Sequence, residues 1–214
     1  MKLQPYCLGS GRSADAIQKA LFVISQNRPD WNILPSIKVA RDRPIPPMEK
    51  DDTKNVIFIA NPLALHTPAL IAAAKAGFDA AIIEKPAAVN LKQIADLGEI
   101  TIPVGVLHGY RESWGVRTIR RMHKDAQLGE LIAIEGRYWQ SSAATRALDP
   151  IAPKASWKDD TSLSGEYDTL IDIGIHWVDS ACFIAGALPQ KGILALSHLN
   201  SGLARQLSRC KDRR

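Results

Sequence analysis

Two short apolar runs restrict the fold of this chain more than any other feature of its sequence. Residues 55–60 and 80–83 are rich in β-branched and small apolar side chains, and polar residues do not alternate with them. Such runs are typical of parallel strands that are buried on both faces. Between the two runs, Thr67-Pro68 predicts the start of a helix, with Thr67 as its N-cap, and Gly77 predicts its end.

The same alternation of strands and helices continues on both sides of these runs. The patterns predict strands over residues 4–8, 35–40 and 102–107 and helices over residues 14–24 and 90–97. Residues 44–47 include three prolines, which exclude a helix at that point. Strands that alternate with helices at this spacing predict an α/β fold with a parallel sheet.

The pattern changes near residue 112, which we take as the boundary between a first domain, residues 1–112, and a second, residues 113–214. In the second domain we expect helices over 113–128 and 173–185, strands over 131–134 and 193–196, a long polar loop over 141–168 and a basic tail over 197–214. Two strands make a poor layer, so we expect an incomplete domain with an exposed apolar surface that favours self-association.

Composition and charge exclude several classes of protein. The apolar runs are too short to span a membrane, and the first residues lack the apolar segment of an export signal. The cysteines Cys7, Cys182 and Cys210 have no metal-ligand spacing, and an odd, sparse set favours a reducing cytoplasm. Residues 205–214 account for +4 of the net charge of +5, which does not indicate a nucleic-acid surface. We therefore expect a cytoplasmic protein with no metal and no nucleic-acid or membrane partner.

A glycine turn at the first strand–helix junction is the first candidate site. It reads Gly9-x-Gly11-x-x-Ala14, and Arg12 lies within it. The first glycine permits a tight turn, the second lets the backbone approach a pyrophosphate, and the helix N-terminus supplies amide donors. The alternative interpretation is an ordinary glycine turn.

The region after the second predicted strand bears on the choice of nucleotide. Asp42 is the best candidate to bind ribose hydroxyls, although it lies farther along the chain than the usual ~20 residues. Arg41 and Arg43 flank it and could instead pair with a 2′-phosphate. A third possibility is a solvated charged loop, so the choice between NAD and NADP stays open.

Polar residues follow both apolar runs. Asn61 and His66 come after the first run, and Glu84-Lys85-Pro86 comes directly after the second. Ligands of open parallel sheets bind beyond the carboxyl ends of the strands. A lysine there can hydrogen-bond a substrate hydroxyl and stabilise the alkoxide as the proton leaves. The alternative is an ordinary charged strand end.

A second cluster of polar residues lies on the predicted helix 173–185. Asp172, His176 and Asp179 are spaced i, i+4 and i+7, so they share one helix face. A histidine with a carboxylate one turn away can act as an acid–base unit, because imidazole titrates near neutral pH. A structural histidine, and an N-cap role for Asp172, are the alternatives.

Together and in this order, these motifs resemble the glucose–fructose oxidoreductase/inositol dehydrogenase family, Gfo/Idh/MocA. The resemblance runs from about residue 6 to about residue 190 and is most specific at Glu84-Lys85-Pro86 and at Asp172-x-Gly174-x-His176-x-x-Asp179. The segment from Leu107 to Arg121, with Gly109-Tyr110-Arg111, is also similar to the family. The resemblance implies a Rossmann-type parallel sheet in an NAD(P)-binding domain, followed by an α/β (α+β) domain for substrate and oligomerisation.

The resemblance also implies an enzyme: an NAD(P)-dependent oxidoreductase that acts on a sugar, a polyol or a related carbonyl compound, as a homo-oligomer in full-length form. Carried over, the catalytic residues are Lys85, Asp172 and His176. The implied cofactor-binding residues are Gly9, Gly11, Arg12, Asp42, Asn61, His66, Glu84 and Lys85. The implied substrate-binding residues are Tyr110, Arg111 and Asp179.

Three departures from the family pattern favour an alternative. The second-strand region lacks a clear acidic signature, and residues 164–168 read Ser-Gly-Glu-Tyr-Asp where members usually have several glycines. Family members also continue with most of the strands of the C-terminal sheet. The alternative is therefore a catalytically idle, truncated form that retains dinucleotide binding or an interaction role.

Overall fold

The computed structural model describes residues 2–40, 44–49, 51–138, 157, 160–165 and 170–189. Its first part is one sheet with the strand order β2-β1-β4-β5-β6, in which β3 also pairs with β1. All these pairings are parallel. The strands are β1 (Lys2–Leu8), β2 (Asn32–Ile33), β3 (Ile37–Val39), β4 (Thr53–Ile59), β5 (Ala80–Glu84) and β6 (Val104–Leu107). The predicted α/β fold with a parallel sheet is confirmed.

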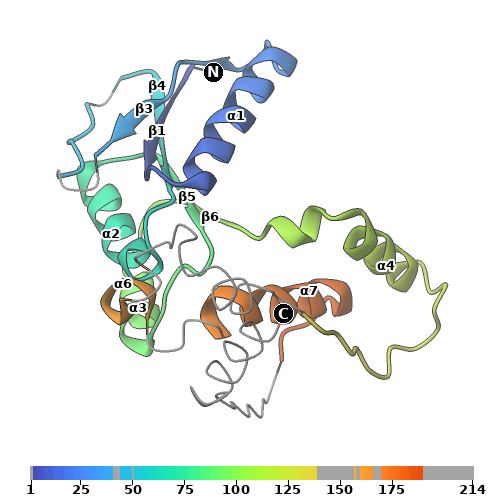
Figure 1. Ribbon diagram of the computed structural model, residues 1–214. Coiled ribbons are helices and arrows are strands. Elements are labelled where there is room, and N and C mark those ends of the chain that lie inside the picture. The colour runs from blue at the N-terminus through green and yellow to red at the C-terminus, as the bar shows by residue number, and fades with distance from the viewer. Residues whose placement is uncertain are drawn as a thin grey trace, which may run out of the picture.

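Helices cover both faces of the sheet (Figure 1). Helix α1 (Arg12–Asn27) lies on one face, and α2 (His66–Ala76) and α3 (Leu91–Leu97) lie on the other; a short 3₁₀ turn, η1 (Leu63–Leu65), precedes α2. The side chain of Asn90 accepts a hydrogen bond from the backbone amide of Gln93, which confirms the predicted cap of α3. The order of layers is therefore helix, sheet, helix.

The two faces of β4 explain why residues 55–60 are apolar without interruption. Ile57 and Ile59 pack with α2 residues in the larger core cluster, whereas Phe58 packs with Ile17 and Leu21 of α1. Removing one such side chain from water contributes about 1.5–3 kcal/mol. Burial on both faces therefore makes β4 the centre of the sheet, as the sequence predicts.

The connection from β3 to β4 contains no helix within the residues that are described. Residues 44–49 have no regular secondary structure, as the three prolines predict. The backbone amide of Met48 donates to the carbonyl of Ala76 at 2.7 Å, which ties this connection to the end of α2. Asp42 lies outside the described residues.

The predicted start of α2, with Thr67 as N-cap and Pro68 as first helical residue, is wrong by two residues. The helix begins at His66, and no side chain caps it. Thr67 is fully buried, and its hydroxyl donates to the carbonyl of Ala87 at 2.8 Å. A buried hydroxyl must find a partner, and here tertiary packing supplies one after β5, so the side chain does not cap its own helix.

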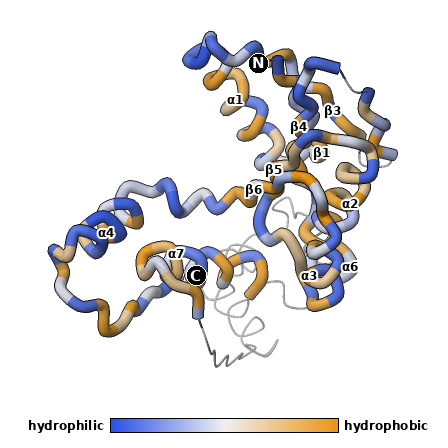
Figure 2. The backbone as a smooth tube through the Cα atoms, turned by 180° about the vertical axis from the view of Figure 1, so that it is seen from behind, coloured by the Kyte–Doolittle hydropathy of each residue, from blue (hydrophilic) through white to orange (hydrophobic). Residues whose placement is uncertain are grey.

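The second part of the chain is mainly helical in the described residues. It contains a 3₁₀ turn η2 (Gly109–Glu112), α4 (Trp114–Lys124), the short α6 (Thr161–Ser164), a turn of π-helix η4 (Leu170–Gly174) and α7 (Ile175–Ala185). Helices α4 and α7 lie side by side; α4 is largely hydrophilic, whereas α7 is largely hydrophobic (Figure 2). The guanidinium of Arg120 on α4 lies 3.7 Å from the ring centroid of Phe183 on α7, so one basic residue contributes to this packing.

The strand predicted over residues 131–134 does not form. Residues 131–138 have no regular secondary structure, and the side chain of Ile132 is 94% exposed. A strand needs a hydrogen-bonding neighbour, and the described part of the chain places none beside this segment. The predicted strand 193–196, the tail 197–214 and most of the loop 141–168 lie outside the described residues.

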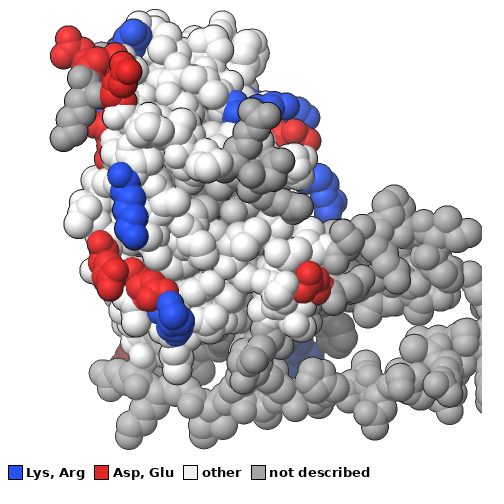
Figure 3. Space-filling view, turned by 90° about the vertical axis from the view of Figure 1, so that its left-hand side faces the viewer, with Lys and Arg blue, Asp and Glu red and all other residues white. Residues whose placement is uncertain are grey.

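The distribution of charge and the length of the helices bear on which partners the protein could have. Seen in Figure 3, one face of the molecule is mostly uncharged, and positive and negative side chains are mixed along its margins. Across the ranges that the structure describes, no helix has both the length and the apolar character needed to cross a membrane.

The backbone at Gly9 imposes a strict steric limit where β1 ends. Gly9 has a φ of +139°, and a Cβ there would lie 2.5 Å from the carbonyl oxygen of Ala60, which follows β4. At Gly11, in contrast, a Cβ would meet no atom within 4 Å. The first glycine is therefore required by the fold, and the second is not.

We predict that Gly9→Ala lowers the free energy of unfolding by about 2–3 kcal/mol, because the new methyl group collides with backbone in a conformation that L-residues avoid. Gly11→Ala is the matched control and should change stability by less than about 1 kcal/mol. Urea denaturation followed by circular dichroism measures both. Equal stability of the two variants would contradict the prediction.

Candidate functional site

A polar cavity of about 760 Å³ opens at the carboxyl ends of the central strands. It lies where the loops after β1, β4 and β5 meet, the position at which open parallel sheets bind ligands. Its described lining residues are Gly9, Ser10, Gly11, Arg12, Ser13, Lys38, Val39, Ala40, Ala60, Asn61, Pro62, Leu63, His66, Glu84, Lys85, Trp157 and Asp172. The cavity thus collects all the residues predicted to bind cofactor that the structure describes.

The glycine turn forms one wall of this cavity. Gly11 is the N-cap of α1 and has extended backbone, and no side chain caps the helix. The first backbone amides of a helix have no partner within it and carry a partial positive charge. Since the space beyond the Cα of Gly11 is open, an anionic group can approach these amides closely.

Asn61 presents an unsatisfied acceptor at the same cavity. Its side-chain nitrogen donates weakly to the carbonyl of Leu65 at 3.3 Å. Its Oδ1 is buried and has no hydrogen-bond partner among the described residues. Buried acceptors are nearly always paired in folded proteins, so this oxygen is suited to receive a donor from a ligand.

His66 joins two of the loops around the cavity. It is fully buried; its Nδ1 lies 2.6 Å from the carbonyl oxygen of Pro86, and its Nε2 lies 2.8 Å from that of Asn61. Burial lowers the pKa of His66, and the two carbonyl contacts oppose that shift. Both ring nitrogens are therefore engaged with backbone. Its direct contact with a cofactor stays a prediction, whereas its place as a link between the loops after β4 and β5 is observed.

Lys85 and Asp172 form a largely buried ion pair at the edge of the cavity. The Nζ of Lys85 donates to Oδ1 of Asp172 at 2.6 Å and to its backbone carbonyl at 2.7 Å. Each side chain is only 13% exposed. The suggestion that Asp172 caps a helix is not supported, because α7 begins after Gly174 and Asp172 lies within η4. The geometry places two of the three predicted catalytic residues in direct contact.

His176, the third, stands in an aromatic cluster beside them. Its ring centroid lies 4.5 Å from that of Tyr110 and 6.4 Å from that of Tyr138, and the two tyrosine hydroxyls are 2.9 Å apart. Its Nδ1 is buried without a hydrogen-bond partner in the described residues. Burial, followed by the Lys85 ammonium, lowers the pKa of His176, and the Asp172 carboxylate opposes the shift. These surroundings therefore favour the neutral form of His176.

The residues predicted to bind substrate largely bind each other. Nε and Nη2 of Arg111 donate to the carboxylate of Asp179 at 2.5–3.1 Å. The Nδ1 of His108 lies 3.4 Å from the same carboxylate. This network joins the segment after β6 to α7. The polar groups of Arg111 and Asp179 are engaged with each other. A substrate role for these two residues stays a prediction.

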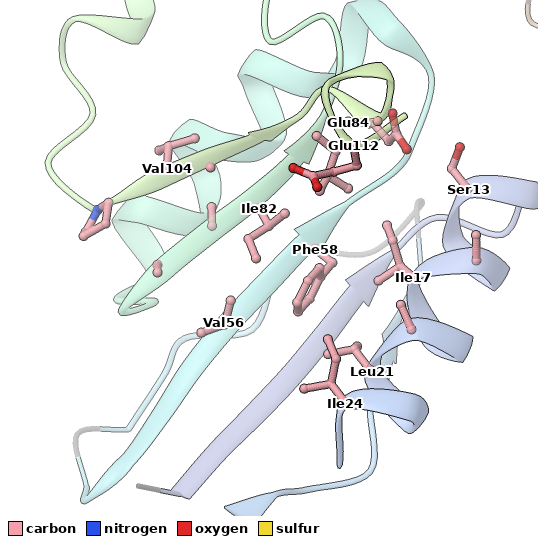
Figure 4. Close-up of a pocket in the computed structure, with 18 of the residues that line it drawn as sticks. Ser13, Ile17, Leu21, Ile24, Val56, Phe58, Ile82, Glu84, Val104 and Glu112 are labelled. Carbon is pink, nitrogen blue, oxygen red and sulfur yellow. The ribbon is translucent and has the colours of Figure 1, made fainter. Parts of the chain in front are cut away.

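A second, apolar cavity of about 1190 Å³ lies on the face of the sheet that α1 covers in part. Ile17 and Leu21 of α1 face Phe58 of β4 across it, and Val104 of β6 lies on its far side (Figure 4). Its lining includes His176 and Tyr110, whereas Lys85 and Asp172 line the polar cavity. Glu84 lines both, so the two cavities are neighbours at the end of β5.

Sequence reasoning missed three residues of this region. Tyr138 and His108 lie in segments with no periodic pattern, and Trp157 lies in the polar stretch predicted to be a loop. Contacts with distant residues place Tyr138 and His108 at the site. The position of His108 immediately after a predicted strand could have indicated it; nothing local indicates the other two.

The fold has well-defined relatives among solved structures. It is similar to an NAD-binding oxidoreductase from Klebsiella pneumoniae, with a TM-score of 0.68 and 20% identity over 87% of this chain and 54% of that chain. An inositol dehydrogenase homolog complexed with NAD+ from Azotobacter vinelandii has a TM-score of 0.59 and 18% identity over 86% of this chain and 54% of that one. A myo-inositol 2-dehydrogenase from Lactobacillus plantarum has a TM-score of 0.56 and 15% identity over 87% and 57%.

These likenesses define an α/β protein with the fold of dinucleotide-binding oxidoreductases. Residues 116–202 match the family model described as the GFO/IDH/MocA C-terminal domain. The resemblance to the Gfo/Idh/MocA family that the sequence predicts is therefore confirmed. The chain spans about half the length of the solved relatives. No curated protein sequence matches it.

We predict that His66→Ala destabilises the protein by about 3–4 kcal/mol. The change removes the one N–H that the neutral ring can donate to a buried carbonyl, which costs about 1–3 kcal/mol, and it leaves a cavity where a fully buried ring stood. His66→Gln, whose amide can still donate to one carbonyl, should lose less. Urea denaturation of the three proteins measures the difference. If His66→Ala unfolds at the wild-type urea concentration, the two loops do not depend on this side chain.

Proposed function

We propose that the protein is an NAD(P)-dependent oxidoreductase that acts on a sugar, a polyol or a related hydroxy or carbonyl compound. One observation carries the proposal: a single polar cavity joins the glycine turn, suited to a pyrophosphate, to the Lys85–Asp172 pair, suited to a reacting hydroxyl. The relatives whose names include NAD or inositol support the same class of cofactor and substrate. A shared fold does not by itself imply a shared reaction, so the proposal is argued from the residues of the site.

The described residues fit a dinucleotide. The cavity has a volume within the range of about 300–1,000 Å³ that is common for small-molecule sites. Gly11 leaves room for a pyrophosphate at the start of α1, and Oδ1 of Asn61 offers an acceptor to a bound donor. A bound nicotinamide supplies the hydride acceptor in oxidation and the hydride donor in reduction.

Lys85 is placed to bind the reacting oxygen. An ammonium group has three N–H donors, and Asp172 receives two of them. The third can donate to a substrate hydroxyl and stabilise the negative charge that develops on its oxygen. Asp172 acts by holding the ammonium in place.

His176 is placed to accept the hydroxyl proton in the oxidative direction. The neutral ring that its lowered pKa favours is the form that can take a proton. The substrate would lie between Lys85 and His176, close to Glu84, where the two cavities adjoin.

The second candidate role is dinucleotide binding without turnover, as a binding or interaction protein. The exposed apolar side chains of the second part favour it, since Ile132 and Trp114 are 94% and 81% exposed. A dehydrogenase screen over sugars and polyols separates the two roles. Cofactor binding with no turnover would support this second role.

We predict that Lys85→Met and His176→Gln each lower kcat by about 10²–10⁴-fold, because each removes a group that acts on the moving proton or on the charge that it leaves. Cofactor affinity should change far less. Gly11→Val is the converse control, since its side chain fills the space next to the amides and should weaken dinucleotide binding. Fluorescence titration and steady-state kinetics provide both measurements. Ordinary turnover in either catalytic variant would exclude the assigned role.

We also predict the direction of the pH dependence. The pKa of His176 lies below its ordinary value of about 6.5, so oxidation should proceed at a constant kcat/KM above neutral pH. As the pH falls through this lowered pKa, the ring gains a proton and kcat/KM should fall. His176→Gln should remove this inflection. An inflection above pH 7 that disappears in the variant would contradict a lowered pKa.

A further inference from the structure

We propose that the cavity selects NADP(H) over NAD(H), and that Arg12 and Lys38 hold the 2′-phosphate of the adenosine ribose. This inference rests on the proposed function, because it concerns which dinucleotide occupies the same site. It assigns a role to two charged side chains that the mechanism above does not use.

The charges around the cavity fall into two groups. Glu84, Lys85 and Asp172 lie at the end of β5 and beside it, and there Lys85 and Asp172 neutralise each other. Arg12 and Lys38 line the part next to the glycine turn, since Arg12 follows Gly11 and Lys38 pairs with Cys7. Neither makes a salt bridge to any carboxylate in the part of the chain that the structure describes. Among the described residues, this part of the cavity therefore carries two positive charges that no carboxylate pairs with.

The sheet register places these two cations on the same side. Lys38 of β3 pairs with Cys7 of β1, so both side chains point to one face of the sheet. Cys7 also pairs with Phe58 of β4, whose side chain packs with Ile17 and Leu21, so that face is the one covered by α1. Arg12 is the first residue of α1. Lys38 and Arg12 thus approach the end of the cavity from neighbouring elements.

This end of the cavity is where the adenosine ribose lies in dinucleotide-binding folds. The pyrophosphate sits on the helix N-terminus after the first strand, and the ribose lies next to the end of the second strand of the motif. A carboxylate there binds the two ribose hydroxyls of NAD, whereas a cation accommodates the 2′-phosphate of NADP. Here β3 ends beside the glycine turn, and the described lining residues at this end include no carboxylate. Asp15 lies further along α1 and does not line the cavity.

The two side chains suit a phosphate in complementary ways. The planar guanidinium of Arg12 can donate two parallel hydrogen bonds to phosphate oxygens, and the ammonium of Lys38 acts as a compact point charge. A phosphate dianion gains from both cations, whereas an uncharged ribose diol gains little. The geometry therefore favours the phosphorylated cofactor.

Titration of the purified protein with NADP+ and with NAD+ tests the inference, and 2′,5′-ADP and 5′-AMP serve as smaller probes of the same difference. We expect NADP+ to bind at least about tenfold more tightly than NAD+, since a hydrogen bond to a charged group contributes about 1.5–3 kcal/mol. The preference should weaken as salt is added, because the partly exposed charges are screened.

Two variants and a matched control locate the effect. Arg12→Gln and Lys38→Gln should each weaken NADP+ and 2′,5′-ADP binding by about tenfold and change NAD+ and 5′-AMP binding by less than about twofold. Lys19→Gln is the control, because it removes the same charge from an exposed position of α1 outside the cavity. Thermal unfolding confirms that each variant is folded.

The outcomes separate this inference from the function on which it rests. Equal or tighter binding of NAD+ would overturn the NADP preference and leave the oxidoreductase proposal standing; it is also the result expected if Asp42 binds the ribose hydroxyls. Binding of neither dinucleotide would overturn both. Loss of NADP+ affinity in Lys19→Gln equal to that in Arg12→Gln would show that general charge, and not these two residues, selects the cofactor.

Discussion

The close approach of two backbone segments organises the whole site. Gly9, at the end of β1, lies against the carbonyl group of Ala60, at the end of β4, with no room for a side chain between them. The backbone amide of Ala60 donates to the carbonyl of Leu8 at 2.8 Å and holds the two turns together. The other residues of the site are positioned from this contact, one after another along the loops. The turn after β4 leads to His66, and His66 contacts the loop after β5 that carries Lys85. The position of Lys85 therefore depends on a contact that is made between β1 and β4.

The Lys85–Asp172 pair extends this chain of contacts from the sheet into the second part of the molecule. The lysine belongs to the end of a strand, whereas its partner belongs to the π-turn that leads into α7. Each side chain is only 13% exposed, so removing one member leaves the other as an unpaired, largely buried charge. The loss of stability on breaking such a pair is far larger than the gain on forming it. The segment 109–112 is fixed to α7 in the same way, through Arg111 and Asp179. The sheet thus provides the polar cavity, and the turn that leads into α7 provides the carboxylate at its edge.

Local chemistry in the sequence was sufficient for the first part of the fold and insufficient for the second. The continuous apolar runs predicted β4 and β5 because burial on both faces leaves a simple pattern, and Asn90 predicted the cap of α3 because that contact spans three residues. Thr67 was misassigned because its hydroxyl binds Ala87, twenty residues away in the chain. The prediction of a strand at 131–134 is wrong because a strand forms only beside a hydrogen-bonding neighbour strand, which a local pattern does not reveal. The pairing of Asp179 with Arg111 likewise depends on tertiary packing. The two-residue β2 was missed because so short a strand has no detectable period.

The uneven cover of the sheet has a consequence for how the protein opens. β1 is paired with β4 along its full length and is flanked by β2 and β3, whereas β6 is paired only with β5 among the described strands, over four positions. Val104 and Val106 of β6 stay more than a third exposed. Backbone amides of β6 should therefore exchange their hydrogens through local openings, and those of β1 and β4 only when the whole sheet unfolds. The glycine turn is anchored in the slowest-exchanging pair of strands, so the part of the cavity that would hold a pyrophosphate is the last to lose its shape.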